Sequence, residues 1–254
     1  MYINVDKTKI MILSPTNLKY DGNLNLQVNK RNLESVTEFK YLGVNIDNNV
    51  NFKLHINKVC KQMYSRMYLI NRYKYYFCSN WLKIFSTSLV LSMLDYCIPV
   101  WGNTTKNVHE RIDKIIFKLA KLVIFGTKLS KTSLFDTLEK LNWLTSAEKY
   151  EVYSLNFIHK HIINVSSLTR CFDEFQKRPD SERSTRSNGD LNVPYMKTKF
   201  GQMAFFYQFS QAWNKLPAEI KEIQNSYVFD RAIRKLIVSK RKDIYEYSGM
   251  RIIS

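Results

Sequence analysis

An apolar residue stands at every third or fourth position between residues 52 and 70, and this spacing constrains the fold more than any other feature of the chain. The positions that follow it are Phe52, Ile56, Val59, Met63, Met67 and Ile70. Such steps bring side chains to one face of an α-helix, whereas a strand, with its period of two, would scatter them over both faces. The pattern predicts an amphipathic helix whose apolar face packs on a core.

The opposite face of this helix is basic and carries an aromatic ring. The residues that recur there at similar spacing are Lys58, Lys61, Tyr68 and Arg72. An ordinary solvated face is one interpretation, since lysine and arginine are common on such faces. A surface that binds nucleic acid is the other. Between residues 53 and 131 the only carboxylates are Asp95, Glu110 and Asp113. Because a polyanion relieves the repulsion among like charges, this interval favours the second interpretation.

Composition indicates a folded and strongly basic protein. The 254 residues carry a formal net charge of +17, and 45% of them are hydrophobic. Few glycines and prolines occur, which is typical of packed, mostly helical structure. The charge favours polyanionic partners, either nucleic acid or an anionic membrane surface. A generically basic protein is the alternative.

The cysteines and histidines do not form a metal-binding pattern. No Cys-x-x-Cys pair exists among Cys60, Cys78, Cys97 and Cys171. Reduced and mostly buried thiols are therefore expected, and neither a zinc ribbon nor a redox motif. His159 and His161 are two residues apart, which on a helix points them to different faces. We expect no metal and no cofactor in this chain.

Neither a signal peptide nor a membrane span is predicted. The N-terminus lacks a basic stretch followed by an apolar core. The apolar run 81–101 contains Lys83 and Asp95, and a buried carboxylate would destabilise a membrane span. We expect a core helix there. We also expect an intracellular protein, nuclear or cytoplasmic and not secreted, that has no membrane partner.

Hydrophobic patterning along the chain predicts an α+β protein that is mostly α. Residues 1–50 favour strands, with β-prone residues at 9–13, a turn at 20–23 and alternation at 24–28. Alternation returns at 39–46 around Tyr41, Val44 and Ile46, with Gly43 as a bulge or close-approach point.

Helical patterning follows from residue 52 onwards. Residues 81–96 are apolar nearly all round, which predicts a central helix. The next predicted helix is 111–125, with lysines outward and Gly126 as its C-cap. Thr145 and Glu148 form a capping box that opens a helix toward Ile163. One helix at 201–215 and a last amphipathic helix with Ser226 as its N-cap complete the pattern. Residues 177–193 have almost no apolar side chains and predict a mobile loop or interdomain linker.

Several short stretches of the chain occur together in one protein family. Asn4-Val5-Asp6-Lys7-Thr8 is followed, after some thirty residues, by the run from Phe39 to Asp47. Both resemble the last two palm blocks of the reverse transcriptase of jockey-type non-LTR retrotransposons. Further stretches resemble the same family in order and rough spacing, so that the resemblance extends to about residue 237. They are 91–97, 100–102, 141–144, 185–187, 193–194 and 212–217.

This resemblance implies an organisation into four regions. Residues 1–50 would be a small antiparallel β remnant of the palm with a primer-grip hairpin. Residues 51–127 would be a helical thumb bundle. Residues 128–240 would be a helical C-terminal region that contains the mobile loop 177–193, and residues 241–254 a tail. The C-terminal stretch with Trp213 and Asn214 suggests no chemical role, so a buried tryptophan and a helix end are expected there.

The resemblance also implies roles for single residues. Asn4 and Lys7 match the block whose lysine lies near the phosphates of the incoming nucleotide and can protonate the leaving pyrophosphate. The residues that match the primer grip are Phe39, Tyr41, Leu42 and Gly43. The face pattern of the first helix, rather than a motif, leads us to expect that it contacts the phosphates of a template–primer duplex without sequence preference. The residues concerned are Lys58, Lys61, Tyr68 and Arg72.

The departures from the family concern its chemistry. Its metal-binding carboxylates lie in an aromatic-Ala-Asp-Asp turn upstream of these blocks, and no Asp-Asp pair occurs in this sequence. Two-metal phosphoryl transfer needs such carboxylates. We therefore expect a truncated reverse transcriptase-like protein that is inactive as a polymerase alone, with Lys7 as an orphan proton donor. Magnesium is expected only for the complete polymerase.

The expected partners are RNA, DNA or an RNA–DNA duplex. A non-catalytic interaction or oligomerising module derived from a retrotransposon is the alternative, with self-association through strand edges of the palm remnant. A third, weaker hypothesis is association of the basic amphipathic helices with anionic membranes.

Overall fold

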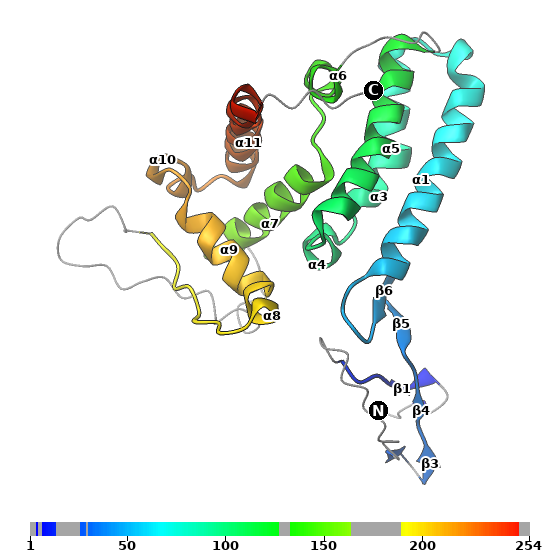
Figure 1. The fold of residues 1–254 in the computed structure, drawn as a ribbon, viewed down its shortest axis with the longest axis vertical. Coiled ribbons are helices and arrows are strands. Elements are labelled where there is room, and N and C mark those ends of the chain that lie inside the picture. Colours follow the sequence, from blue (N-terminus) through cyan, green and yellow to red (C-terminus); the bar gives the residue numbers. More distant parts are fainter. Residues whose placement is uncertain are drawn as a thin grey trace, which may run out of the picture. The chain divides into compact units, whose positions relative to one another are not determined.

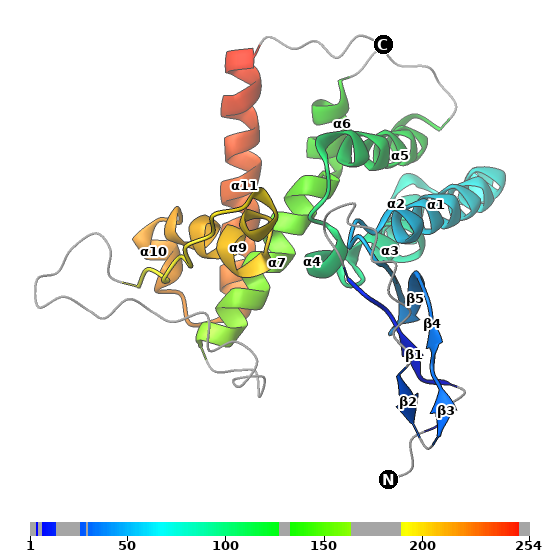
Figure 2. The ribbon, with the colours of Figure 1, turned by 60° about the horizontal axis from the view of Figure 1, so that its bottom comes forward.

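The computed structural model describes residues 4, 7–13, 26–28, 30–126, 133–163 and 189–248, without the side chains of 125, 134, 199, 200 and 242–248. This part of the chain is mostly helical with a few short strands, which confirms the predicted α+β, mostly α class (Figures 1 and 2). It divides into two compact units, residues 1–65 and 66–254. The predicted region boundaries at residues 50 and 127 do not coincide with this division, and the functional regions remain a prediction.

Among the described residues, three two-stranded sheets precede the helix that begins at Lys53. β2 (Gln27–Val28) pairs antiparallel with β3 (Arg31–Asn32), and β5 (Glu38–Tyr41) pairs antiparallel with β6 (Val44–Asp47). β1 (Lys9–Ile10) instead pairs in parallel with β4 (Glu34–Ser35). The prediction of an antiparallel remnant is thus wrong for this pair, because the chain makes a long crossover between β1 and β4 that includes the β2–β3 hairpin. The predicted turn at 20–23 lies outside the described residues.

β5 and β6 form a tight hairpin. Leu42 and Gly43 connect them, with φ angles of 45° and 87°. Two positive φ angles are typical of a type I′ turn, whose twist matches that of the flanking strands. Gly43 is therefore a turn residue between two strands, so the prediction of a bulge within one strand is wrong, and the alternative of a close-approach point stays a prediction. The alternating pattern that suggested a single strand continues across the turn. A two-residue loop places paired side chains of the two strands on the same face, so the alternation is kept.

The Asp47 carboxylate organises the connection from β6 to α1 (Lys53–Tyr73). Its Oδ1 accepts hydrogen bonds from the backbone N–H groups of Asn49 and Asn51, both at 3.1 Å. Val50 and Phe52 have φ angles of 54° and 53°, which are unfavourable for a branched and a bulky side chain. At the first residue of α1, the Lys53 N–H donates to Asn51 Oδ1 at 2.9 Å.

α1 has the predicted amphipathic pattern. The face that the spacing assigned to the core is buried, and its residues are Phe52, Ile56, Val59, Met63 and Ile70, with Met67 partly buried. On the opposite face the exposed residues are Lys58, Lys61, Tyr68 and Arg72. The prediction for this helix is confirmed.

The predicted helix at 81–96 is present, but a π-helical turn interrupts its regular α-helical geometry. It consists of α2 (Ser79–Phe85), the π-helical turn η3 (Ser86–Leu91) and α3 (Ser92–Asp95). Leu82, Val90 and Leu94 are buried, whereas the side chains exposed on the other side are Trp81, Ile84 and Leu89. The hydroxyls of Thr87 and Ser88 donate to carbonyls four residues earlier, which perturbs a regular helix. The prediction that this stretch is buried on all sides is wrong, because its apolar residues show no helical period that would mark the buried face.

The next helices agree more closely with the predictions from the sequence. After α4 (Ile98–Trp101), α5 (Lys106–Phe125) buries Ile112, Ile115 and Leu119 and ends at Gly126, whose φ is 63°. α6 (Leu134–Leu141) leads to α7 (Ser146–Ile162). The capping box of Thr145 and Glu148 is present at the start of α7, as predicted.

α7 is the hub of the C-terminal unit. It contacts α4, α5, α9 (Phe205–Asn214) and α11 (Ser226–Ser248) (Figures 1 and 2). A buried apolar cluster joins α7, α9 and α11, and among its residues are Val152, Leu155, Phe209, Trp213, Phe229 and Ile233. No described helix of the chain is both long enough and apolar enough to cross a membrane.

Three predictions in the C-terminal unit need correction. The predicted helix at 201–215 is two helices, α8 (Lys199–Gln202) and α9, because Ala204 adopts an extended conformation. α10 (Ala218–Lys221) follows. The N-cap of α11 is Asn225, whose Oδ1 accepts from the backbone N–H of Tyr227 at 2.9 Å, and not Ser226. The predicted tail is helical up to residue 248, since the α11 pattern continues beyond residue 240.

The predicted mobile loop is partly anchored. Residues 177–188 lie outside the described residues, but 189–191 pack against the end of α9. The Trp213 Nε1–H donates to the Gly189 carbonyl at 3.0 Å. Asn214 pairs with both backbone groups of the buried Leu191, at 2.8 and 2.9 Å. The expected structural roles of Trp213 and Asn214 are confirmed. Residues 189–191 lie outside helices and strands, as a loop would, and these hydrogen bonds hold them.

Candidate nucleic-acid interface

Asn4 and Lys7 lie in one exposed turn of the N-terminal unit. The Asn4 Oδ1 accepts from the Lys7 backbone N–H at 3.3 Å, and the Asn4 carbonyl accepts from the Thr8 hydroxyl at 2.8 Å. These two hydrogen bonds are local to the turn. The structure therefore brings Asn4 and Lys7 together but leaves their predicted roles untested.

The β5–β6 hairpin presents aromatic and apolar side chains to solvent. Phe39 and Tyr41 are two residues apart on β5, so they project from the same face of the strand. Both are exposed, as is Leu42 at the turn. The paired strand β6 contributes the buried Val44 and Asp47. The predicted primer-grip residues Phe39, Tyr41, Leu42 and Gly43 are thus all exposed, on β5 and at the turn of the hairpin.

A neutral histidine supports this hairpin from α1. The His55 Nδ1 accepts from the Asn45 backbone N–H at 3.4 Å. Burial, together with the nearby Lys58 ammonium, lowers the pKa of His55. Because the imidazole is held neutral, Nδ1 keeps the lone pair that this contact requires.

The exposed face of α1 carries what we call the basic stripe, which comprises Lys58, Lys61, Tyr68 and Arg72. At roughly 100° of rotation per residue these four side chains fall within an arc of about 80°, opposite the buried Met63. Within the described part of the chain, none of the three cations forms an ion pair. The stripe therefore presents unneutralised positive charge to solvent.

The three carboxylates that follow the stripe along the chain are engaged elsewhere. Asp95 pairs with Lys149 on α7. Glu110 lies 4.0 Å from Lys106 on its own helix, and Asp113 accepts from the backbone N–H of Ser146 at 2.7 Å. Their charges are thus committed to contacts within the C-terminal unit, which leaves the basic stripe for an external anion.

Exposed aromatic residues follow α1, and no motif predicts them as a functional surface. The turn η2 (Lys74–Tyr76) exposes Tyr75 and Tyr76 almost fully, while Lys74 is buried. The only signal in the sequence is the run from Tyr73 to Phe77, which is aromatic apart from Lys74 and lies in a stretch that has no carboxylate between Asp47 and Asp95. Aromatic runs more often belong to a hydrophobic core, so the sequence favours burial of these rings over exposure.

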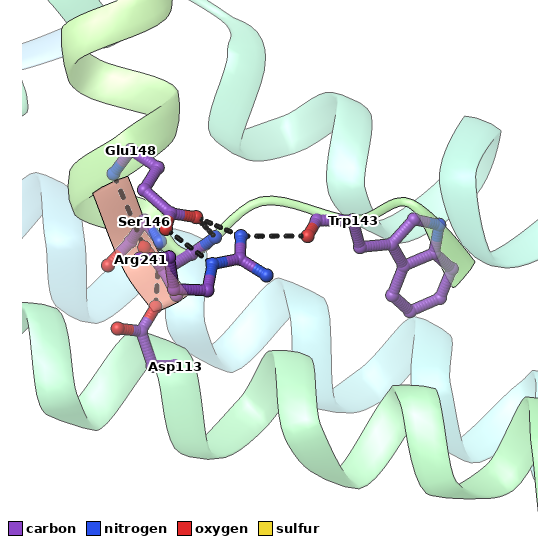
Figure 3. Close-up of polar contacts among 6 residues, drawn as sticks. Asp113, Trp143, Ser146, Glu148 and Arg241 are labelled. Carbon is purple, nitrogen blue, oxygen red and sulfur yellow. Dashed lines mark hydrogen bonds and ion pairs between the residues drawn. The ribbon is translucent and has the colours of Figure 1, made fainter. Parts of the chain in front are cut away.

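A second polar cluster, which we call the polar clamp, lies at the start of α7 (Figure 3). It comprises Asp113 from α5, Ser146 and Glu148 from α7, Arg241 from α11 and the Trp143 carbonyl. The Arg241 Nε donates to Glu148 Oε1 at 2.6 Å, and Nη2 donates to Glu148 Oε2 and, at 3.2 Å, to the Trp143 carbonyl. Asp113 accepts the first free N–H of α7, which belongs to Ser146. The clamp therefore ties three helices together at one helix terminus.

The clamp also contains a serine and a histidine, but its geometry is that of a cap. The His109 Nδ1 lies 2.9 Å from the Ser146 hydroxyl, and burial lowers the pKa of His109. Ser146 is buried, and Asp113 binds the Ser146 backbone rather than the imidazole. A nucleophilic serine needs access to substrate and an acid that orients its histidine. Both conditions fail here, which leaves the satisfaction of helix N–H groups as the function of the cluster.

The histidines of α7 show no metal-binding arrangement. His159 is buried, its ring stacks on Phe229 with 3.8 Å between centroids, and its Nε2 lies 2.6 Å from the Ile223 carbonyl. Burial lowers the pKa of His159, so Nε2–H donates to this carbonyl from a neutral ring. Within the described ranges, no group of three or more His, Cys, Asp or Glu residues is placed to hold a metal ion.

Comparisons with known proteins add no relative. No family model, no curated protein and no solved structure matches this chain.

Proposed function

We propose that this chain grips nucleic acid by its sugar–phosphate backbone, as the primer-grip and thumb part of a jockey-type non-LTR retrotransposon reverse transcriptase. The basic stripe is the observation that carries the proposal. Its three cations share one face of α1, lack ion pairs among the described residues and lie in a stretch without a carboxylate between Asp47 and Asp95. Cations in such a setting attract phosphates and read no sequence.

The exposed hairpin tip fits the same proposal. Phe39, Tyr41 and Leu42 offer apolar and aromatic surface beside backbone groups. Such a surface can hold the end of a primer strand through its sugar and terminal base, while the stripe contacts phosphates. Together they would bind an RNA–DNA or DNA duplex without sequence preference.

The proposed activity of this chain alone is binding without polymerisation. Phosphoryl transfer by two metal ions requires carboxylates that hold the ions, and the sequence contains no Asp-Asp pair. The exposed Lys7 could donate a proton to pyrophosphate only beside a magnesium site that the rest of a polymerase supplies. Lys7 is therefore proposed as a phosphate contact in this chain.

Salt dependence of binding tests the proposal directly. We expect an RNA–DNA duplex, followed by fluorescence anisotropy, to bind with an affinity that falls steeply as salt rises, because binding releases counterions. The triple variant K58Q/K61Q/R72Q should bind roughly tenfold or more weakly at low salt. Its slope of log affinity against log salt should be smaller by about 3, since each lost phosphate contact contributes about 0.9.

A matched variant separates position from net charge. R231Q/K235Q/K240Q removes three exposed cations from α11 and lowers the net charge of the chain equally, so it should keep most of the parent slope. Equal effects of both triple variants would reject the basic stripe as the site. A parent affinity that hardly changes with salt would reject backbone binding altogether. Circular dichroism of each variant checks that helix content is retained.

Self-association is a second candidate, favoured by the exposure of β5. All four residues of β5 are exposed, and among the described strands β5 pairs only with β6. An unpaired edge with apolar side chains can pair with another copy. On this hypothesis the mass measured by light scattering rises with concentration, and Tyr41→Lys lowers it. A constant monomer mass over the same range would exclude it.

A further inference from the structure

We propose that residues 72–81 form a second binding surface, which takes a single strand of RNA or DNA by stacking its bases on exposed aromatic rings. We call this surface the aromatic turn; it comprises Arg72, Tyr73, Lys74, Tyr75, Tyr76 and Trp81. The inference rests on the proposed nucleic-acid binding and specifies a second form of nucleic acid, unpaired and distinct from the duplex assigned to the basic stripe.

The rings of the aromatic turn are open to solvent. Tyr75 is 78% and Tyr76 80% exposed, and the rings of Tyr73 and Tyr76 lie 6.5 Å apart and are tilted by 46°. Trp81, which is 55% exposed, stacks on Phe85 through one face at 6.2 Å between centroids. Rings left open in this way offer flat surfaces, and every nucleobase has a matching flat face.

Two cations lie directly beside these rings. The Arg72 guanidinium lies 5.9 Å from the centroid of Tyr73, and the Lys74 ammonium lies 5.0 Å from that of Tyr75. Lys74 is only 6% exposed, and its ammonium donates to the Asn71 side chain at 2.9 Å. Within the described part of the chain it forms no ion pair with a carboxylate. A buried ammonium normally has a counter-charge, and a phosphate between stacked bases would supply one.

The geometry favours an unpaired strand over a duplex or a membrane. A duplex keeps its bases stacked inside, so it offers phosphates but few base faces to protruding rings. A membrane surface takes the long apolar face of an amphipathic helix, whereas these tyrosines project from a three-residue turn. The turn is also anchored, because the Ser79 hydroxyl at the start of α2 donates to the Val123 carbonyl of α5 at 3.1 Å. Alternating cations and rings on a fixed turn are the arrangement that binds single strands.

Intrinsic fluorescence reports on this surface selectively. Of the four tryptophans, Trp101, Trp143 and Trp213 are buried, at 1%, 6% and 1% exposed, and only Trp81 is open to solvent. We expect oligo(dT) to quench the emission of Trp81, and W81F to abolish the quenching. Y75A/Y76A should lower the affinity for oligo(dT) by roughly 10- to 100-fold, since base stacking on each ring contributes strongly to binding. The affinity for the RNA–DNA duplex should stay within about twofold of the parent value.

Tyr227→Ala is the matched control. Tyr227 is an exposed tyrosine on α11 with the Arg231 guanidinium 5.9 Å from its ring centroid, so it reproduces the side chain and the adjacent cation at another place. It should leave oligo(dT) binding unchanged. The four substituted residues, Tyr75, Tyr76, Trp81 and Tyr227, are all exposed. Circular dichroism checks that each variant keeps its helix content.

Each outcome decides between the proposals. Quenching by oligo(dT) that Y75A/Y76A weakens and Y227A does not supports the aromatic turn. Duplex binding without quenching by oligo(dT) overturns it and leaves the proposed function intact. Vesicles of phosphatidylserine and phosphatidylcholine that blue-shift Trp81, with no effect of oligo(dT), would assign the turn to membranes and overturn it. Failure of both duplex and single strand to bind would overturn both proposals.

Discussion

Replacing Arg241 by alanine is expected to lower the free energy of unfolding by about 3–5 kcal/mol. The Arg241 guanidinium is buried and makes hydrogen bonds to both Glu148 oxygens and to the Trp143 carbonyl. Without it, the largely buried Glu148 carboxylate would lose its counter-ion. That loss is large because the site is shielded from water, whereas an exposed ion pair contributes little.

Urea denaturation followed by circular dichroism measures this change. Arg231→Ala is the matched control, since Arg231 is an exposed arginine of the same helix, and it should change the free energy of unfolding by no more than about 0.5 kcal/mol. In the double variant R241A/E148Q the carboxylate charge is absent as well, so part of the lost stability should return. Equal stabilities of R241A and R231A would show that the clamp does not hold the helices together.

Asp113→Asn is expected to stabilise the protein at pH 7 by about 2–3 kcal/mol. Desolvation raises the pKa of Asp113 to about 6, from an ordinary value of 3.8. Between these two values the folded state binds more protons than the unfolded state, so the ionised carboxylate costs stability as pH rises through the interval. Asparagine avoids that cost and still accepts the hydrogen bond from the Ser146 N–H, which lies 2.7 Å from Asp113 Oδ1.

The pH dependence of the difference is the sharper measurement. The advantage of D113N over the parent should be full near pH 7, shrink as pH falls through 6 and be nearly gone at about pH 4, where the folded parent is protonated. Asp136→Asn, which changes an exposed aspartate of α6, should show no such trend. A difference that stays constant between pH 4 and 7 would mean that burial does not perturb Asp113.

The elements with a clear period were predictable from sequence. α1, α5 and α7 each run for several turns with one buried face, so errors at single positions could not hide the repeat. Their ends were also predictable where local chemistry marks them, as with Gly126 and the Thr145–Glu148 capping box. For the stretch 81–96 the prediction of burial on all sides failed. Its residues are apolar on every side of the helix, and apolar composition without a period does not indicate which side packs on the core.

The candidate site was predictable only in part. The exposure of Lys58, Lys61, Tyr68 and Arg72 followed from the helical period, because a face opposite a core must be solvated. The solvent exposure of Tyr75 and Tyr76 could not be predicted in this way. Aromatic residues are usually buried, and a three-residue turn is too short to show a helical period. The pairing of Arg241 with Glu148 lies beyond any local pattern, because 93 residues separate the two.

That separation also affects the biosynthesis of the protein. A ribosome adds roughly 5–20 residues per second, so on the order of 5–20 s pass between translation of codon 148 and translation of codon 241. During this interval Glu148 has been synthesised without Arg241, the residue that pairs with it in the folded unit. The C-terminal unit can therefore reach its native state only after nearly the whole chain has been synthesised.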